Sequence, residues 1–259
     1  MIEYLFGDSD LAAHRLKVLA DVFAASSRAF MSEAGNPAPR LAVDMGCGPG
    51  HTTHLLADAL RCQRAIGLDN SEHFIGLAEK TATDRVSFSL HDVTRVPFPV
   101  GPCDLIYSRF LLTHQPDPET LIAKWATQLH PTGRLLLEEV DSIRTKNQTF
   151  VNYIQIVEQT LANAGGDLYI GQRLAAAGTP DGLLTRSSRT VRVPVTNQLA
   201  AKMFSMNIQT WKHNAFVQEK YSAVSTQQLE ESLLRLTAKP SSDGGIEWGL
   251  RQLVYKRKN

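Results

Sequence analysis

Three glycines at alternate positions follow an acidic residue: Asp44 precedes Gly46, Gly48 and Gly50. Glycine lets a backbone turn sharply and approach a ligand with no Cβ atom in the way, and the helix predicted to follow would offer unpaired N–H groups. A dinucleotide-binding turn would need glycine at position 51, where the chain has His51. The Asp44 carboxylate would repel a phosphate and attract a cation, such as an amino-acid ammonium group. The motif therefore predicts a nucleotide-like ligand that carries a positive charge.

Two further acidic residues follow predicted strands. Asp69 ends the second predicted strand, where open α/β sheets place an acceptor for ribose hydroxyl groups. Asp69 could instead cap the next helix, but Asn70 and Ser71 already supply capping side chains, which favours a ligand role for Asp69. Asp92 follows the third predicted strand and is either a ligand contact or a loop carboxylate.

Apolar periodicity places these residues on a framework of alternating strands and helices. Strands are predicted at 41–45, 64–68, 86–90, 104–108, 134–138, 189–195 and 251–255. Helices are predicted at 11–31, 51–60, from 70 onward, and at 118–129, 145–164, 199–217 and 226–236. Because strands that alternate with helices form right-handed βαβ units, the order predicts a mainly parallel sheet with the motif residues at the carboxyl ends of its strands.

The acidic-x-Gly-x-Gly-x-Gly motif at the end of the first predicted strand resembles the first motif of the class I S-adenosylmethionine-dependent methyltransferases. The resemblance is specific over roughly 41–138, and elsewhere it rests on the order of the elements. It implies one domain over 1–259, an α/β Rossmann-like fold with a seven-stranded mainly parallel sheet, helices on both faces and the last strand antiparallel. It also implies an N-terminal helical cap at 1–36, a cofactor-binding core at 40–140, and substrate-cap helices with the sixth strand at 142–225.

The resemblance implies S-adenosylmethionine as cofactor, released as S-adenosylhomocysteine. In that family an acidic residue at the position of Asp92 accepts the adenine amino group, while its neighbour, here Val93, packs on the ring. The expected cofactor-binding residues are Asp44, Gly46, Cys47, Gly48, Gly50, Thr52, Asp69, Asn70, Ser71, Asp92, Val93, Ser108 and Arg109.

Methyl transfer is a displacement on an activated carbon, so positioning and exclusion of water can supply most of the acceleration. His114 is the candidate base, because an unperturbed histidine has a pKa of about 6.5; it could instead only order its loop. The expected substrate-pocket residues are Tyr4, Phe110, His114, Glu139, Tyr169, Met206 and Trp211. Met206 and Trp211 lie at helical spacing with other apolar residues, so they could equally belong to a core.

Two motifs of other methyltransferase classes are absent from this sequence, which narrows the reactions to be expected. Ser108-Arg109-Phe110 follows the fourth predicted strand, where amino-methyltransferases acting on nucleobases or amides carry N/D-P-P-Y/F and metal-dependent catechol-type enzymes carry a magnesium-binding Asp. His51 and His54 have no third metal ligand nearby, and the acidic residues at 138–141 more readily contact substrate than a cation. We therefore expect no metal.

Composition limits the partners. Lys and Arg total 27 against 26 Asp and Glu, a net charge of +1, so no basic field favours nucleic acid or an anionic membrane. The first residues do not resemble a signal peptide, and no run of about 18 apolar residues occurs, so a cytoplasmic protein is expected. The three cysteines are expected to be reduced thiols.

The sequence thus predicts methyl transfer to an O, N or activated C atom of a small organic metabolite by a monomer or homodimer. Two alternatives stay open. One is a protein or RNA methyltransferase. The other is a member that binds the cofactor without methyl transfer, as a cyclase or a structural protein.

Overall fold

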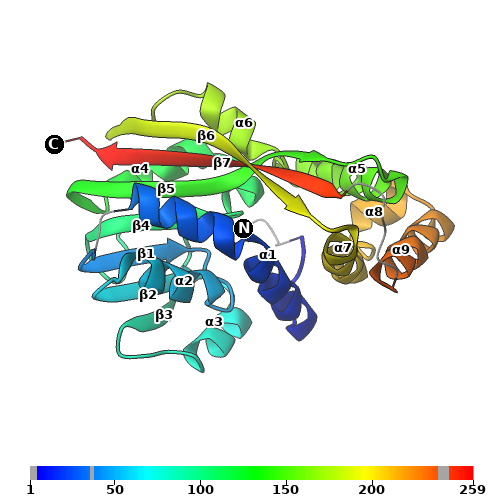
Figure 1. The fold of residues 1–259 in the computed structure, drawn as a ribbon, viewed down its shortest axis with the longest axis horizontal. Helices are drawn as coiled ribbons and strands as arrows, with labels where there is room; N and C mark the ends of the chain where they lie inside the picture. Colours follow the sequence, from blue (N-terminus) through cyan, green and yellow to red (C-terminus); the bar gives the residue numbers. More distant parts are fainter. Residues whose placement is uncertain (1–4, 36–37, 239–244, 259) are drawn as a thin grey trace.

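One mixed sheet organises the computed structural model, which describes residues 5–35, 38–238 and 245–258 (Figure 1). In these residues seven strands lie in the order β3-β2-β1-β4-β5-β7-β6. The strands are β1 (Leu41–Met45), β2 (Arg64–Asp69), β3 (Val86–Leu90), β4 (Cys103–Arg109), β5 (Leu129–Arg144), β6 (Leu183–Val195) and β7 (Ile246–Arg257). β7 runs antiparallel to both of its neighbours, and the other pairings are parallel. This confirms the predicted α/β fold.

The strand order reverses beside β1, whose neighbours are β2 and β4. β1 and β4 are buried along almost their whole length, as expected of central parallel strands covered on both faces. In open α/β sheets a ligand crevice forms beyond the carboxyl ends of the strands at such a reversal. The glycine motif that follows β1 and the residues that follow β4 therefore meet at this crevice.

Helices cover both faces of the sheet. On one face α1 (Asp10–Ala34) and α2 (His51–Leu60) pack Phe30 and Leu56 against Tyr107 of β4. On the other face α4 (Pro118–Ala126) and α6 (Ile170–Ala176) pack Trp125 and Ile170 against Ile106. α3 (Glu72–Glu79) lies beside β2 and β3. Successive β4 residues thus serve opposite cores, as the two-residue period of a strand requires.

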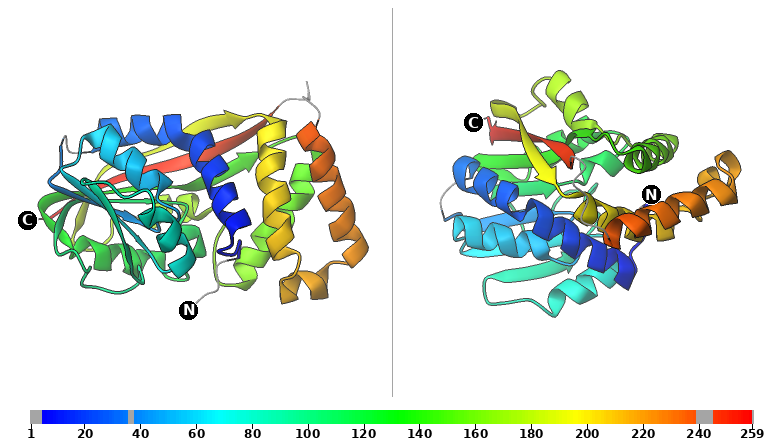
Figure 2. Two further views of the ribbon diagram at one scale, coloured as in Figure 1. Left: turned by 90° about the horizontal axis from the view of Figure 1, so that it is seen from below. Right: turned by 45° about the vertical axis from the view of Figure 1, so that its right-hand side comes forward.

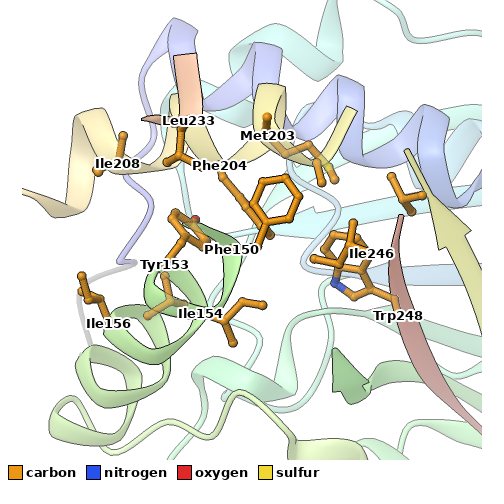
Figure 3. Packing of buried hydrophobic residues seen from close by; sticks show 14 of the residues in the cluster. Phe150, Tyr153, Ile154, Ile156, Met203, Phe204, Ile208, Leu233, Ile246 and Trp248 are labelled. Carbon is orange, nitrogen blue, oxygen red and sulfur yellow. The ribbon is translucent and has the colours of Figure 1, made fainter. Parts of the chain in front are cut away.

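A cap of further helices lies beyond the sheet (Figure 2). It consists of α5 (Gln148–Asn163), α7 (Asn197–Trp211), α8 (Ala215–Lys220) and α9 (Ala223–Ala238). Figure 3 shows Phe150 and Tyr153 of α5 against Phe204 of α7, with Trp248 of β7 nearby; the rings of Tyr153 and Phe204 stack with centroids 4.0 Å apart. The helices α7 to α9 are inserted between two residues that pair in the sheet, Val195 of β6 and Ile246 of β7.

Several element boundaries differ from those predicted. The helix predicted over 199–217 is two helices, α7 and α8, because Asn214 interrupts it and caps α8 by accepting a hydrogen bond from the Phe216 N–H at 3.0 Å. The helix predicted over 118–129 ends at Ala126. β5 is longer than the predicted 134–138 and contains the predicted turn at 130–133, where its pairing with β4 is irregular and Thr132 has φ of 71°.

No helix in the described part of the chain is long and apolar enough to cross a membrane.

Candidate functional site

A cavity of about 700 Å³ lies where the sheet meets the cap. Its sheet side is formed by the glycine loop after β1 and by the residues that follow β2 and β4, and its other walls come from α1, α5, α7 and β7. The predicted cofactor-binding residues that line it are Gly46, Cys47, Gly48, Thr52, Asp69, Asn70, Ser71, Val93 and Arg109. Of the predicted substrate-pocket residues, Phe110 and His114 line it. The spacing in the sequence and the sheet topology thus bring these eleven residues to one place.

Asp69 joins the glycine loop to the start of α3. Its Oδ2 accepts a hydrogen bond from the Gly48 N–H at 2.8 Å, and its Oδ1 accepts one from the Ser71 N–H at 2.9 Å. Burial raises the pKa of Asp69. The Ser71 hydroxyl caps α3 by accepting from the Phe74 N–H at 3.1 Å, which leaves Asp69 facing the cavity. Because each carboxylate oxygen has two lone pairs, Asp69 can also accept hydrogen bonds from ligand hydroxyl groups.

The glycines of the motif have different surroundings. Gly48 has a φ of 52°, and a Cβ atom there would meet only Leu16 Cδ1, at 3.3 Å, so its backbone is open to the cavity. Gly50 begins α2, and a Cβ atom there would lie 2.6 Å from the Phe88 ring. Gly50 therefore serves the close packing of the loop against β3 and does not line the cavity.

Asp44 lies beneath the loop and does not line the cavity. Its Oδ2 accepts hydrogen bonds from the hydroxyls of Thr52 at 2.6 Å and Thr53 at 2.7 Å, which ties β1 to α2. The side chain is buried, and burial raises its pKa to about 6. A ligand cation above the loop would feel the charge of Asp44 without touching it.

Asp92 and Ser108 also lie outside the cavity lining. Asp92 accepts hydrogen bonds from the backbone and the hydroxyl of Thr94, at 2.9 and 2.7 Å, and pairs with Arg95 at 3.3 Å. Partial burial acts to raise the pKa of Asp92, but the Thr94 hydrogen bonds and the Arg95 charge outweigh it and lower the pKa. Ser108 is fully buried, and its Oγ has no hydrogen-bond partner among the described residues. Their roles as cofactor contacts stay predictions.

Arg109 connects the cavity to a buried carboxylate, Glu138. Its guanidinium donates to the Ser27 hydroxyl at 2.8 Å, and Ser27 in turn donates to Glu138. Glu138 also accepts hydrogen bonds from the Tyr107 hydroxyl at 2.9 Å and the Gln252 amide at 2.8 Å. The network joins α1, β4, β5 and β7 beneath the cavity, so the hydrogen bonds of Glu138 hold elements together.

Glu139 anchors the loop that follows β4. Its Oε1 accepts hydrogen bonds from the N–H groups of Leu111 at 3.0 Å and Leu112 at 2.9 Å, and burial raises its pKa to about 8. Its neighbour Asp141 pairs with Arg251 at 2.7 Å. No group of three or more His, Cys, Asp or Glu residues that could hold a metal ion is found in the described ranges.

His114 lies in a short 3₁₀ helix (Leu112–His114) that follows this loop. Burial, and next the charge of Arg15, lower the pKa of His114 to about 3. Its ring meets that of Phe6 edge-on, with centroids 5.8 Å apart. His114 therefore lacks the pKa near neutrality that a general base needs: it is neutral at physiological pH and is a weak base.

The remaining predicted substrate residues have other surroundings. Tyr169 directly precedes α6. The cavity lining does not include Tyr169, Met206 or Glu139. Trp211 is 1% exposed, lies in the cap core with its ring centroid 5.6 Å from that of Tyr153, and does not line the cavity. Tyr4 lies outside the described residues.

The comparisons with known proteins agree with this geometry. Residues 43–137 match the family model described as a methyltransferase domain. The chain is 38% identical over 109 residues to trans-aconitate 2-methyltransferase of Variovorax paradoxus, and the match covers 41% of each protein. It is 25% identical over 215 residues to trans-aconitate 2-methyltransferase of Methylobacterium nodulans, and this match covers 81% of the chain and 83% of that protein. The chain thus spans about two fifths of the length of the Variovorax relative. The family model thus identifies residues 43–137 as a methyltransferase domain, and the two relatives are methyltransferases.

A solved structure shares the fold of this chain. It is Haemonchus contortus phosphoethanolamine N-methyltransferase 2 in complex with S-adenosylhomocysteine. The TM-score is 0.55 at 16% identity, with 92% of this chain and 56% of that chain covered.

The cavity lining also includes residues that the sequence did not single out, among them Arg15, Tyr153, Asn207 and Trp248. Arg15 had a usable signal, because it interrupts the apolar positions of α1 at helical spacing and is only 5% exposed. Asn207 lies one helical turn from Met203 and Phe204, on the same side of α7. Nothing in the local sequence distinguishes this side from the one that carries Met206.

Proposed function

We propose that this methyltransferase binds S-adenosylmethionine at the sheet side of the cavity and transfers its methyl group to a small organic acceptor. The observation that carries the proposal is the contact between Asp69 and Gly48 at the cavity wall, 2.8 Å between Oδ2 and N. It brings an acceptor for ribose hydroxyl groups and an exposed glycine backbone together at the switch point of the sheet.

The donor set fits this cofactor. Asp69 suits the ribose hydroxyls, and Val93 offers an apolar wall for the adenine ring. Arg15 and Arg109, both at least nine-tenths buried, line the cavity and suit a carboxylate, while the charge of Asp44 beneath the loop suits an ammonium group. The bound cofactor would supply a methyl group made electrophilic by a positively charged sulfur.

The protein's own contribution is positioning and exclusion of water. α1, α5 and α7 enclose the cavity with apolar side chains, which lowers the local dielectric around the reacting atoms. His114 is neutral and can orient an acceptor by hydrogen bonding, whereas its low pKa makes it a poor base.

The names of the relatives support a small-molecule acceptor. Both relatives named above are trans-aconitate 2-methyltransferases, and we propose a metabolite with an O, N or activated C nucleophile for this chain. We further propose a single catalytic domain with caps at 1–36 and 142–225, the second continuing through α9, which packs on α7 through Leu229 and Leu233. We also propose that the protein is a cytoplasmic monomer or homodimer.

The test combines binding and product detection. Calorimetry measures the affinity for S-adenosylmethionine and S-adenosylhomocysteine, and mass spectrometry searches a metabolite extract for a product heavier by one methylene. The Asp69→Ala variant should form no such product while it keeps the circular dichroism of the folded protein. Cofactor binding without any methylated metabolite would favour a protein or RNA acceptor or a role without methyl transfer.

A further inference from the structure

The two sides of the cavity differ in charge. The charged residues that line it, such as Arg15, Asp69 and Arg109, all lie before Gln115. Among the described residues, no Arg, Lys, His, Asp or Glu beyond Gln115 lines the cavity. The lining residues that follow Gln115, here called the cap side, therefore include no charged side chain.

Aromatic rings of this cap side form a cluster with rings from α1 and from the residue after β4. The rings of Phe23 and Phe110 meet edge-on with centroids 5.2 Å apart, and Phe23 also meets Trp248 at 5.8 Å. The ring centroids of Phe204 and Trp248 lie 5.9 Å apart, and Figure 3 shows these two side chains with Met203 nearby. Such a wall gains most from the burial of an apolar or ring-bearing ligand. A carboxylate placed against the rings of Phe204 and Trp248 would lose its hydration, and the lining residues that follow Gln115 offer it no cation.

One polar atom on this side has no partner. The Asn207 amide donates through Nδ2 to the Tyr153 hydroxyl at 2.8 Å, whereas Asn207 Oδ1 is buried with no hydrogen-bond partner among the described residues. Asn207 is 8% exposed and lines the cavity. A buried carbonyl oxygen is stabilised by a donor, so this atom marks the place of a hydroxyl or N–H group on a ligand.

We propose that the acceptor, in the reaction proposed above, is an uncharged, largely apolar molecule with a ring, whose hydroxyl or N–H group donates to Asn207 Oδ1. This separates the chain from its relatives named after trans-aconitate, a polycarboxylate. That this ligand is the methyl acceptor rests on the proposed function. Its chemistry rests on the cavity wall.

The experiment uses the full chain loaded with S-adenosylhomocysteine and equilibrium dialysis against three probes. 2-Naphthol has an apolar ring system and a donor, 2-methoxynaphthalene has the ring system without a donor, and trans-aconitate is the polycarboxylate. We expect 2-naphthol to bind at least about tenfold more tightly than trans-aconitate. The Asn207→Leu variant should lower the affinity for 2-naphthol by about tenfold, the usual effect of losing one buried hydrogen bond. Its affinity for 2-methoxynaphthalene should stay unchanged. Asn152→Leu, an exposed asparagine on α5, is the matched control and should change neither affinity.

Tighter binding of trans-aconitate than of 2-naphthol, or no binding of either naphthalene, would overturn the inference. An equal loss of both naphthalenes in Asn207→Leu would assign Asn207 to packing and overturn its role as acceptor of the hydrogen bond. Failure of S-adenosylhomocysteine to bind would contradict the proposed function instead. The probes would then be tested on the protein alone, and the same affinities would decide the inference.

Discussion

Asp69 fixes the backbone of Gly48: its Oδ2 accepts the Gly48 N–H at 2.8 Å, while its Oδ1 accepts the Ser71 N–H at 2.9 Å. One carboxylate thus sets the shape of the loop after β1 and of the turn after β2. The geometry of the cavity wall depends on this contact even before a ligand binds.

The first prediction concerns Asp69→Asn. An amide has one acceptor oxygen in place of two, so one of the two N–H groups loses its partner and the charge-assisted contact to a ribose is lost. We expect the affinity for S-adenosylmethionine to fall by about 1.5–3 kcal/mol, measured by calorimetry. Asp58→Asn, an exposed residue paired loosely with Arg85 at 3.7 Å, is the control. Unchanged affinity in Asp69→Asn would remove Asp69 from the ligand site.

The second prediction concerns Gly48→Val. Its φ of 52° is strained for a β-branched residue, and the new side chain would enter the space where the backbone faces the cavity. Cofactor binding should be lost while the far-ultraviolet circular dichroism is kept. Gly76→Ala is the control, because a Cβ atom at Gly76 meets nothing within 4 Å. If Gly48→Val bound the cofactor normally, the glycine would serve the turn alone.

The third prediction is a pH dependence of stability from Glu139. Burial raises its pKa to about 8, above the value of about 4.3 for an unfolded chain. A raised carboxyl pKa stabilises the protonated fold, so this contribution is complete below about pH 4 and is lost as the pH rises through about 8. The Glu139→Gln variant stays uncharged and should lack this loss.

Urea unfolding at pH 5 and pH 9 measures the effect. The free energy of unfolding of the natural protein should fall relative to that of Glu139→Gln, by an amount on the order of a few kcal/mol. Glu79→Gln, an exposed residue on α3, should follow the natural protein. Parallel curves for the natural protein and Glu139→Gln would show that Glu139 is ionised in the fold.

The fourth prediction is that His114 stays neutral. Because burial lowers its pKa to about 3, its imidazole signal in nuclear magnetic resonance should not titrate between pH 5 and pH 8. A lowered histidine pKa destabilises the fold only in acid, since the buried ring must then become charged. Comparison with His114→Gln assigns the signal. Titration near pH 6.5 would restore the case for a general base.

The fifth prediction separates packing from substrate contact in the cap. Trp211 is 1% exposed, so Trp211→Ala should lower the free energy of unfolding by about 3–5 kcal/mol in urea. Met206→Ala is the comparison. Because Met206 is only half-buried, its replacement should lower the free energy of unfolding by less. A Trp211→Ala variant that unfolds like the natural protein but changes acceptor preference would return Trp211 to the substrate pocket.

The sheet and its glycine loop were predictable because their signals are local. Asp44, Gly48 and Asp69 stand at the ends of apolar runs, and parallel strands bring such ends together. The cavity wall beyond β4 was not predictable in the same way. Whether Met206 or Asn207 faces a ligand depends on how α7 rotates against α5, which is set by contacts such as the Tyr153–Phe204 stack far apart in the sequence.

The pKa of His114 shows the same limit. The residue type indicates a base near neutrality, but the shift to about 3 comes from burial and from Arg15, which lies on another helix. Likewise, Glu139 looks like a substrate contact in the sequence, whereas the fold uses it to hold the N–H groups of Leu111 and Leu112.

The pairing of Val195 with Ile246 gives the cap a modular character. The inserted helices α7 to α9 leave the sheet and return to it at neighbouring residues, so the register of β6 and β7 does not depend on what lies between them. Loop-closure entropy grows only slowly with the length of such an insertion. Exchange of this segment would therefore change the part of the cavity wall that α7 supplies and leave the contact between Asp69 and Gly48 in place.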